Sequence, residues 1–344
     1  MKLKIKKLKP ANVVLSCFFI FFIILIFLLR KPLTTFAASE PFVNLVSFTP
    51  QKIAEFGGAT TKVDVGMNIR EIRYFNILSG DFVLDITIWF KFDHRLVFLD
   101  RIGKFKFDRA VILEKGPPYK SLVGKKTLVS YDMRIKLRDT LNYKRFPLDD
   151  HRIFITLTNF FLTILEVSFV AYNSNFTYNP EIQTQGWVCV GKSVRTGFLE
   201  RDIKLNGRVR KEYYPRIVFA LDFERSGIRN ILTIVIPLLI IFFISSITLA
   251  IEHTKENKTR LITMAIASVT AIIAYRFIID NMSPKTGYFM ISDHFFFLFL
   301  FACCVIIIFN VFGERISNFY KSIFVLLLYV ILTMASIVIL YAAF

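Results

Sequence analysis

Small and hydroxylated side chains recur along one line of the segment from residue 259 to residue 281. They stand at steps of three and four residues, so a helix would place them on one face. The members are Thr259, Thr263, Ala267, Thr270, Ala274, Phe277 and Asn281. Threonine oxygens can replace part of the hydration shell of an ion, which predicts a water-lined pore built from several copies of this helix. The residue types alone also allow close packing between membrane helices, where such residues are common.

A second line of the same segment is aliphatic and consists of Ile262, Ile266, Val269 and Ile273. The two lines define two alternative registers for a pore, one residue apart. We prefer the register in which the hydroxylated line, including Phe277, faces the pore. This register keeps the aliphatic line away from water, and a ring of phenylalanines could close the pore by dewetting.

Residue spacing gives no support to enzymatic chemistry. The four histidines, His94, His151, His253 and His294, are isolated, and no set of cysteines and histidines has zinc spacing. The stretch from Gly124 to Thr127 is similar to a phosphate loop, but no helix follows it. We therefore predict no enzyme, no cofactor and no metal site.

The composition is typical of a membrane protein. Of the 344 residues, 54% are hydrophobic, and the formal charge is +18. Lysines 2, 4, 6, 7 and 9 precede the apolar run Val13–Leu29, a pattern that the positive-inside rule explains more simply than nucleic-acid binding does. We expect residues 1–39 to be either a signal peptide cleaved near Ala37–Ser39 or an uncleaved signal anchor. Both interpretations export residue 40 onward. Together with the apolar runs later in the chain, this predicts a multi-pass protein of the cell membrane.

Two further domains are predicted. Residues 40–226 contain short runs rich in Val, Ile, Phe and Tyr with turn residues between them, which favours an all-β, antiparallel, immunoglobulin-like sandwich. A turn at Leu78–Asp81 is expected to join the first two strands. This domain would be extracellular or periplasmic. Residues 227–344 contain four apolar runs, which predict a four-helix transmembrane bundle. These runs lie near 228–251, 259–281, 295–312 and 322–344.

Four motifs stand in order along the chain. They are Asp93-His94-Arg95-Leu96, Arg145-Phe146-Pro147-Leu148-Asp149, Arg225 with Pro237, and Pro284-Lys285-Thr286-Gly287-Tyr288 with Asp293. In this order and spacing they resemble the pentameric ligand-gated ion channels, the Cys-loop receptor superfamily, and most closely its bacterial members that lack the Cys-loop. The resemblance covers the chain from about Val63 to the C-terminus.

The resemblance implies a homopentamer in membrane lipid, with five copies of the 259–281 helix around a pore for monovalent ions. Alignment from Pro284 would place Thr263 at the narrow cytoplasmic end of this pore and Phe277 near its outer end. A small molecule or protons would open it. It also implies a coupling zone at the membrane surface that passes ligand-driven movement to the pore helix. The residues of this zone would be Asp81, Phe146, Pro147, Asp149, Arg225, Pro284, Lys285 and Tyr288. Aromatic residues in the stretches of the inter-subunit ligand pocket could hold a cation. These are Tyr172, Phe176, Tyr178, Tyr213 and Tyr214.

The chain departs from the family pattern in its extracellular part. Lys91 stands where the family normally has tryptophan, and the segment from Val97 to Ser130 lacks the W-x-P motif that helps to form the ligand pocket. The sign of the permeant ion stays open. Arg260 would favour anions if it faces the pore, but Glu252 and Glu256 precede it. The alternative function is a non-conducting membrane sensor with the same layout and a plugged pore.

Overall fold

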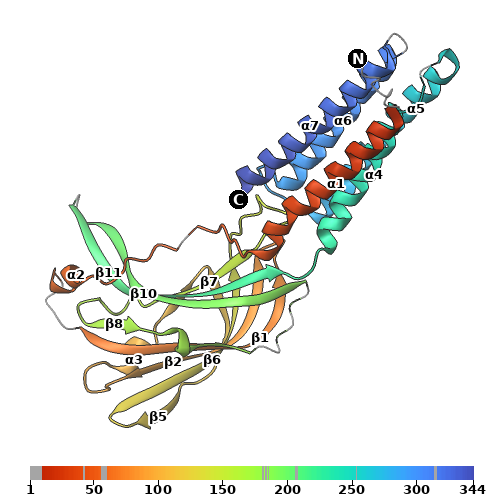
Figure 1. Cartoon of the computed structure of the whole chain (residues 1–344). Helices are drawn as coiled ribbons and strands as arrows, with labels where there is room; N and C mark the ends of the chain where they lie inside the picture. The colour runs from red at the N-terminus through yellow and green to blue at the C-terminus, as the bar shows by residue number, and fades with distance from the viewer. Residues whose placement is uncertain are drawn as a thin grey trace, which may run out of the picture. The chain divides into compact units, whose positions relative to one another are not determined.

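The computed structural model describes residues 10–344 except 42, 56–59, 180–181, 183, 185, 206–207, 253 and 314–315. The lysines before position 10 and His253 lie outside the described residues. The chain forms two compact units (Figure 1). The helical unit comprises Met1–Ala37, Tyr143–Asp149 and Gly227–Phe344. The β unit comprises Ala38–Asn142 and Asp150–Ser226.

The first two strands form the predicted hairpin. Strand β1 (Thr61–Asn76) pairs antiparallel with β2 (Asp81–Phe92), from Asn76 opposite Asp81 to Asp64 opposite Lys91. Burial largely alternates along β2, as expected for a strand with one face on a core. Gly80 closes the turn at a φ of +66°, and a Cβ there would lie 2.2 Å from the Asp139 carbonyl oxygen. The turn therefore requires glycine.

Two sheets make up the β unit. Among the described residues, the first sheet has the order β4-β6-β2-β1-β8, with β5 beside β6 and β9 beside β1, and the second has the order β10-β11-β7-β3. Aromatic side chains from both sheets meet in the core, as in the contacts of Phe75 with Phe223 and of Phe176 with Phe219. The other elements are β3 (Lys106–Asp108), β4 (Ala110–Lys115), β5 (Tyr119–Val123), β6 (Lys126–Arg138), β7 (His151–Thr158), β8 (Val167–Val170), β9 (Phe176–Tyr178), β10 (Trp187–Leu205), β11 (Arg208–Arg225), and the short helices α2 (Pro50–Glu55), α3 (Leu99–Ile102) and η1 (Asn173–Asn175).

The predicted antiparallel, immunoglobulin-like sandwich is wrong for this β unit. Strands β8 and β9 both pair parallel with β1. The chain reaches β8 by leaving the second sheet after β7 and crossing to the first. Only a tight hairpin requires antiparallel pairing, so a crossing strand can take either direction. Residue patterns within a strand carry no information on this choice.

The predicted bundle of four helices after the β domain is also wrong. Five described helices are long and apolar enough to cross a membrane, and α1 (Pro10–Thr34) precedes the β unit. Helix α1 packs on α7 (Asn318–Ala343) and α4 (Arg229–Ile247). Phe18 lies 4.2 Å from Phe243 between ring centroids, and Phe21 is fully buried beside Tyr329. An apolar run without a polar face does not reveal from its sequence whether it packs on protein or on lipid.

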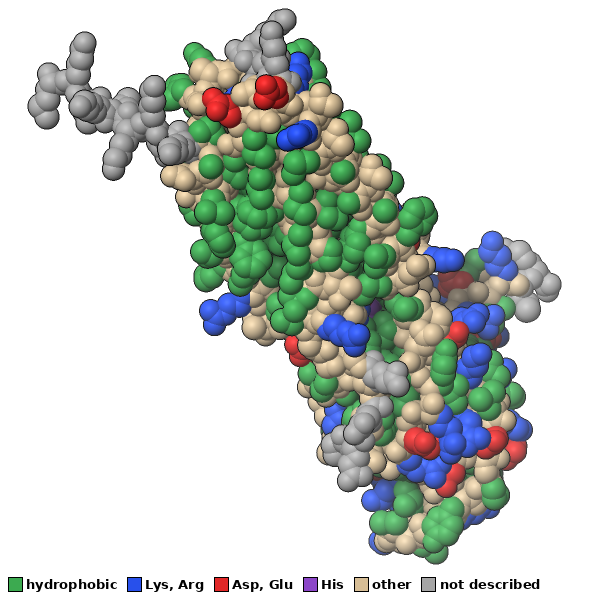
Figure 2. Space-filling model, turned by 90° about the vertical axis from the view of Figure 1, so that its right-hand side faces the viewer, with side chains coloured by type: hydrophobic (Ala, Val, Ile, Leu, Met, Phe, Trp, Pro, Cys, Tyr) green, Lys and Arg blue, Asp and Glu red, His purple; other side chains and the backbone are tan. Residues whose placement is uncertain are grey.

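The remaining helices complete the helical unit. Helix α5 (Lys255–Met282) packs on α4 and on α6 (Ile291–Phe312), and α6 also contacts α7. Pro237 lies inside α4, which is tolerated in membrane helices. Figure 2 shows hydrophobic side chains over the middle of the helical unit and charged side chains at its ends. This distribution is compatible with a multi-pass membrane protein.

Candidate functional site: the exposed face of α5 and the α5–α6 loop

Helix α5 has one buried face and, opposite to it, the line of predicted pore residues. The buried face consists of Leu261, Ala265, Ser268, Ile272 and Ile279. Because each residue turns the helix by about 100°, the line from Thr259 to Asn281 is centred on the opposite side. All seven predicted pore residues are exposed in the single chain, and Phe277 has 71% of its surface accessible.

The aliphatic line of α5 is a flank and not the buried face. Ile266 and Ile273 each remain 50% exposed, between the hydroxylated line and the face that packs on α6. A third line, which starts at Leu261 and is not evident from the residue types, makes the contacts with α4 and α6. A flank of this kind is available to lipid or to a neighbouring copy of α5.

The threonines of the exposed line bond to their own helix. The Thr263 hydroxyl donates to the Thr259 carbonyl oxygen at 2.9 Å, and the Thr270 hydroxyl donates to the Ile266 carbonyl oxygen at 3.1 Å. Each hydroxyl oxygen then keeps acceptor capacity for water or a cation. Helix α5 also begins four residues before the predicted run. Glu256 therefore lies in its first turn, seven residues before Thr263, and extends the same line, which sequence reasoning missed.

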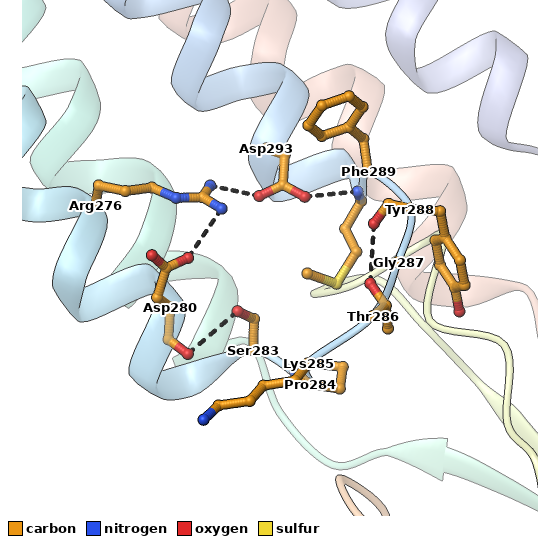
Figure 3. A pocket seen from close by; sticks show the side chains of 11 residues that line it. Arg276, Asp280, Ser283, Pro284, Lys285, Thr286, Gly287, Tyr288, Phe289 and Asp293 are labelled. Carbon is orange, nitrogen blue, oxygen red and sulfur yellow. Dashed lines mark hydrogen bonds and ion pairs between the residues drawn. The ribbon is translucent and has the colours of Figure 1, made fainter.

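A pocket of about 530 Å³ lies at the loop between α5 and α6 (Figure 3). Its lining includes Arg276 and Asp280 of α5, Asp293 of α6 and the loop from Ser283 to Met290. Arg276 forms an ion pair with Asp293 and a second with Asp280 at 2.8 Å. The other oxygen of Asp293 accepts the Met290 N–H at 2.8 Å. One buried carboxylate thus caps α6 and ties it to α5.

The loop Tyr143–Asp149 bonds to the start of α6. The carbonyl oxygens of Lys144 and Phe146 accept the N–H groups of Ile291 and Ser292, at 3.0 and 3.1 Å. These N–H groups belong to the first turn of α6, which has no partners for them within the helix. The Tyr288 hydroxyl accepts the Tyr143 N–H at 2.9 Å. The predicted coupling residues Phe146, Pro147, Asp149, Pro284, Lys285 and Tyr288 therefore all belong to the helical unit.

Arg145 links the same loop to the last residue of the unit's first segment, Ala37, and to the end of α7. Its Nε donates to the Ala343 carbonyl oxygen at 2.6 Å, and its Nη1 donates to the Ala37 carbonyl oxygen. The guanidinium group also lies 4.5 Å from the centroid of the Phe344 ring. Sequence reasoning placed Arg145 within a motif but gave it no role. In the structure it bonds to the end of α7 and to Ala37, three residues after the end of α1.

The other two predicted coupling residues belong to the β unit. Asp81 accepts a hydrogen bond from Arg138 at 2.9 Å, and this bond lowers the pKa of the Asp81 carboxyl below its usual value. Arg225 stacks on Trp187, with the guanidinium carbon 4.3 Å from the ring centroid. Both residues therefore have contacts within the β unit.

The five aromatic residues predicted for a ligand pocket have different environments. Phe176 is fully buried against Phe219 and belongs to the core. The Tyr178 hydroxyl donates to the Ile182 carbonyl oxygen, and burial raises the pKa of Tyr178 to about 12. Tyr213 packs on Phe198, and Tyr214 packs on Phe160 and donates to Glu212. Tyr172 is 64% exposed.

Comparisons with known proteins do not assign this chain to a family. No protein-family model matches it, and no curated protein sequence matches it. Within the described part of the chain, no group of three or more His, Cys, Asp or Glu residues could hold a metal ion. The case for a function therefore rests on the geometry of the helical unit and on the sequence motifs.

Proposed function

We propose that this protein is a subunit of a ligand-gated ion channel of the pentameric kind, with the pore lined by α5 from five copies. The observation that carries the proposal is the position of the hydroxylated line, opposite the face that α5 buries in its own subunit. In lipid this line would leave the Asn281 amide and the free acceptor positions of the threonine oxygens without polar partners, which is unfavourable. A ring of copies removes that cost by enclosing water.

The contacts of the α5–α6 loop support a gating role for this region. The loop Tyr143–Asp149 bonds to the first turn of α6, and Asp293 in that turn holds Arg276 of the pore helix. A displacement of the first loop can therefore reach the outer end of α5 through bonded groups. Of the residues that the family resemblance implies for coupling, Phe146 lies on this path, through its carbonyl oxygen. Five apolar helices would then anchor each subunit in the membrane.

The test is thiol block of the current through the expressed protein. Currents are recorded across a bilayer or cell membrane over a range of pH and with small amines as trial ligands. We expect a charged thiol reagent to block the Thr263→Cys variant. The matched control is Ala265→Cys, two residues away on the fully buried face. The unmodified chain is a second control, because Cys304 is exposed.

Block of Ala265→Cys but not of Thr263→Cys would contradict the proposed pore face. Absence of current in the presence of assembled protein at the surface calls for Phe277→Ala, which removes the proposed outer constriction. Absence of current in that variant as well would favour the alternative function, a non-conducting membrane sensor.

A further inference from the structure

Glu40 and His151 form a buried pair in the β unit. Glu40 Oε1 lies 2.6 Å from His151 Nδ1, and the two side chains are 2% and 0% exposed. The second oxygen of Glu40 accepts the Arg152 N–H at 3.0 Å. Glu40 comes from the segment after α1, and His151 is the first residue of β7. The pair therefore joins an irregular segment to the second sheet.

This segment, which we call the strap, comprises residues 38–41 and 43–48 and lies along the second sheet. Ala38 forms a bridge with Asp150, and Val46 exchanges two backbone hydrogen bonds of 3.0 Å with Phe198 of β10. Between these points, Val43 and Leu45 pack on a cluster of Phe154, Val218 and Ala220. Within the strap, Glu40 is the one acidic residue.

The pair also contacts a stack that leads to the residues before α4. The His151 ring lies 5.3 Å from the Trp187 ring between centroids, and the Arg225 guanidinium carbon lies 4.3 Å from the centroid of the Trp187 ring. Arg225 is the last residue of β11, and α4 begins at Arg229. A change at His151 can therefore alter the position of Trp187 and, through it, of Arg225.

Other charged groups surround His151. Asp150 and Arg152 flank it on β7, and Arg152 pairs with Asp222 of β11 at 2.5 Å. Glu224 and Arg225 follow on β11, next to Phe223, which lies opposite His151 in the sheet. From the strap the charged group is Glu40. Asp149, which is 1% exposed, precedes Asp150, and the charges of all these groups influence proton uptake at the pair.

The strength of a carboxylate–imidazole contact that is buried away from water depends on the number of protons that the pair holds. With one proton, the pair is an ion pair or two neutral groups joined by a hydrogen bond, and the titration belongs to the pair as a whole. A second proton neutralises the glutamate and leaves a buried imidazolium without its adjacent counter-charge. Acid therefore weakens the contact that holds the strap on β7.

We propose that Glu40 and His151 form a proton-sensitive latch, which fixes the strap on the second sheet and sets the position of Trp187 beneath Arg225. Uptake of a second proton opens the latch, loosens the strap and changes the contact between Trp187 and Arg225. The latch is a property of the β unit, and its effect on gating rests on the proposed channel function.

Tryptophan fluorescence tests the latch without any current. The chain has two tryptophans, so Trp89→Phe leaves Trp187 as the single emitter. Emission of the purified full-length protein is followed from about pH 8 to about pH 4, the range in which histidine and glutamate titrate. We expect one step in emission for Trp89→Phe. The step is lost when Glu40→Gln or His151→Gln is added, and it is kept with His94→Gln, a histidine on another part of the unit.

Persistence of the step in both latch variants overturns the proposal, as does a flat titration of Trp89→Phe. A second measurement needs no latch variant and covers the case in which these variants do not fold. Amide hydrogen exchange of Val46 and Phe198, which bond each other, is followed in the unmodified chain. We expect faster exchange below the pH of the fluorescence step, and unchanged protection across it contradicts the latch. If these measurements establish the latch and the protein carries no current, the result contradicts the channel function and leaves the latch intact.

Discussion

The ion pairs of Arg276 allow a test of the contact that ties α5 to α6, because one arginine holds two carboxylates of different burial. The Asp293 side chain is 4% exposed, and the Asp280 side chain is 49% exposed. Removing one partner of a well-buried pair costs about 3–5 kcal/mol. Arg276 is itself 29% exposed and keeps Asp280, so we expect a loss below that range for Asp293→Asn, about 2–3 kcal/mol.

The Asp293→Asn substitution also alters the cap of α6. An asparagine can accept the Met290 N–H through its oxygen, but its NH2 group then faces the Arg276 guanidinium, where both groups are donors. Asp280→Asn is the matched control, because it removes a carboxylate from the same arginine at an exposed position. Exposed pairs contribute about 0–1 kcal/mol, so we expect a loss below about 1 kcal/mol.

The measurement is the free energy of unfolding of the purified protein in mixed micelles of increasing SDS content. We expect the free energy of unfolding of Asp293→Asn to be lower than that of Asp280→Asn by about 1–2 kcal/mol. Equal losses, or a larger loss for Asp280→Asn, would refute the view that burial decides which carboxylate matters. A far-ultraviolet spectrum of each variant controls for loss of helix.

Further predictions concern the pore and the β unit. Phe277→Ala is expected to raise the current in the absence of ligand, because it removes the proposed outer constriction. Glu256→Gln is expected to lower the permeability of cations relative to anions, measured as a shift in reversal potential, because it removes a carboxylate from the pore line. Gly66→Ala should lower the free energy of unfolding by about 3 kcal/mol, because its Cβ would lie 2.2 Å from an indole carbon of Trp89. Burial raises the pKa of Asp85, but hydrogen bonds from two arginines outweigh it and the net pKa is lowered. This carboxylate therefore stabilises the fold above the ordinary aspartate pKa of about 4, and the contribution is lost as pH falls through the lower folded value. Denaturant titrations should show a shallower acid loss for Asp85→Asn than for the unmodified chain.

Local patterns in the sequence predict the hairpin of β1 and β2 and the extent of the buried strands. Alternation and a glycine turn are sufficient there, because both depend on neighbouring residues. The hairpin of β10 and β11 is much longer than the short strands that the sequence predicts for this domain. Its outer part pairs through backbone hydrogen bonds, from Arg201 opposite Glu212 to Lys204 opposite Val209, and charged residues predominate there. Such pairing leaves no hydrophobic pattern to read.

In the candidate site, too, the sequence predicts features within one helix but not contacts between distant segments. Spacing along one helix predicts which residues share the exposed line of α5, since helical geometry fixes it. The partners of Arg276 could not be predicted, because Asp293 lies on another helix beyond a loop whose path the residue types do not specify. The strap was missed for a related reason. Glu40 and His151 are 111 residues apart, and neither stands in a motif that indicates a partner.

The bonds of the Tyr143–Asp149 loop suggest an order in which movement would pass through the proposed channel. This loop bonds directly to α6 through two carbonyl oxygens, and to the end of α7 through Arg145. It also bonds to the α5–α6 loop, where the Tyr143 N–H donates to the Tyr288 hydroxyl. Since Asp293 lies in the first turn of α6 and holds Arg276, α6 should move first and draw the outer end of α5 after it. Tyr288→Phe removes the direct bond and leaves this route intact, whereas Asp293→Asn breaks it. Gating should therefore survive Tyr288→Phe with a modest shift in ligand sensitivity and be impaired by Asp293→Asn, and the opposite result would place the main route in the α5–α6 loop.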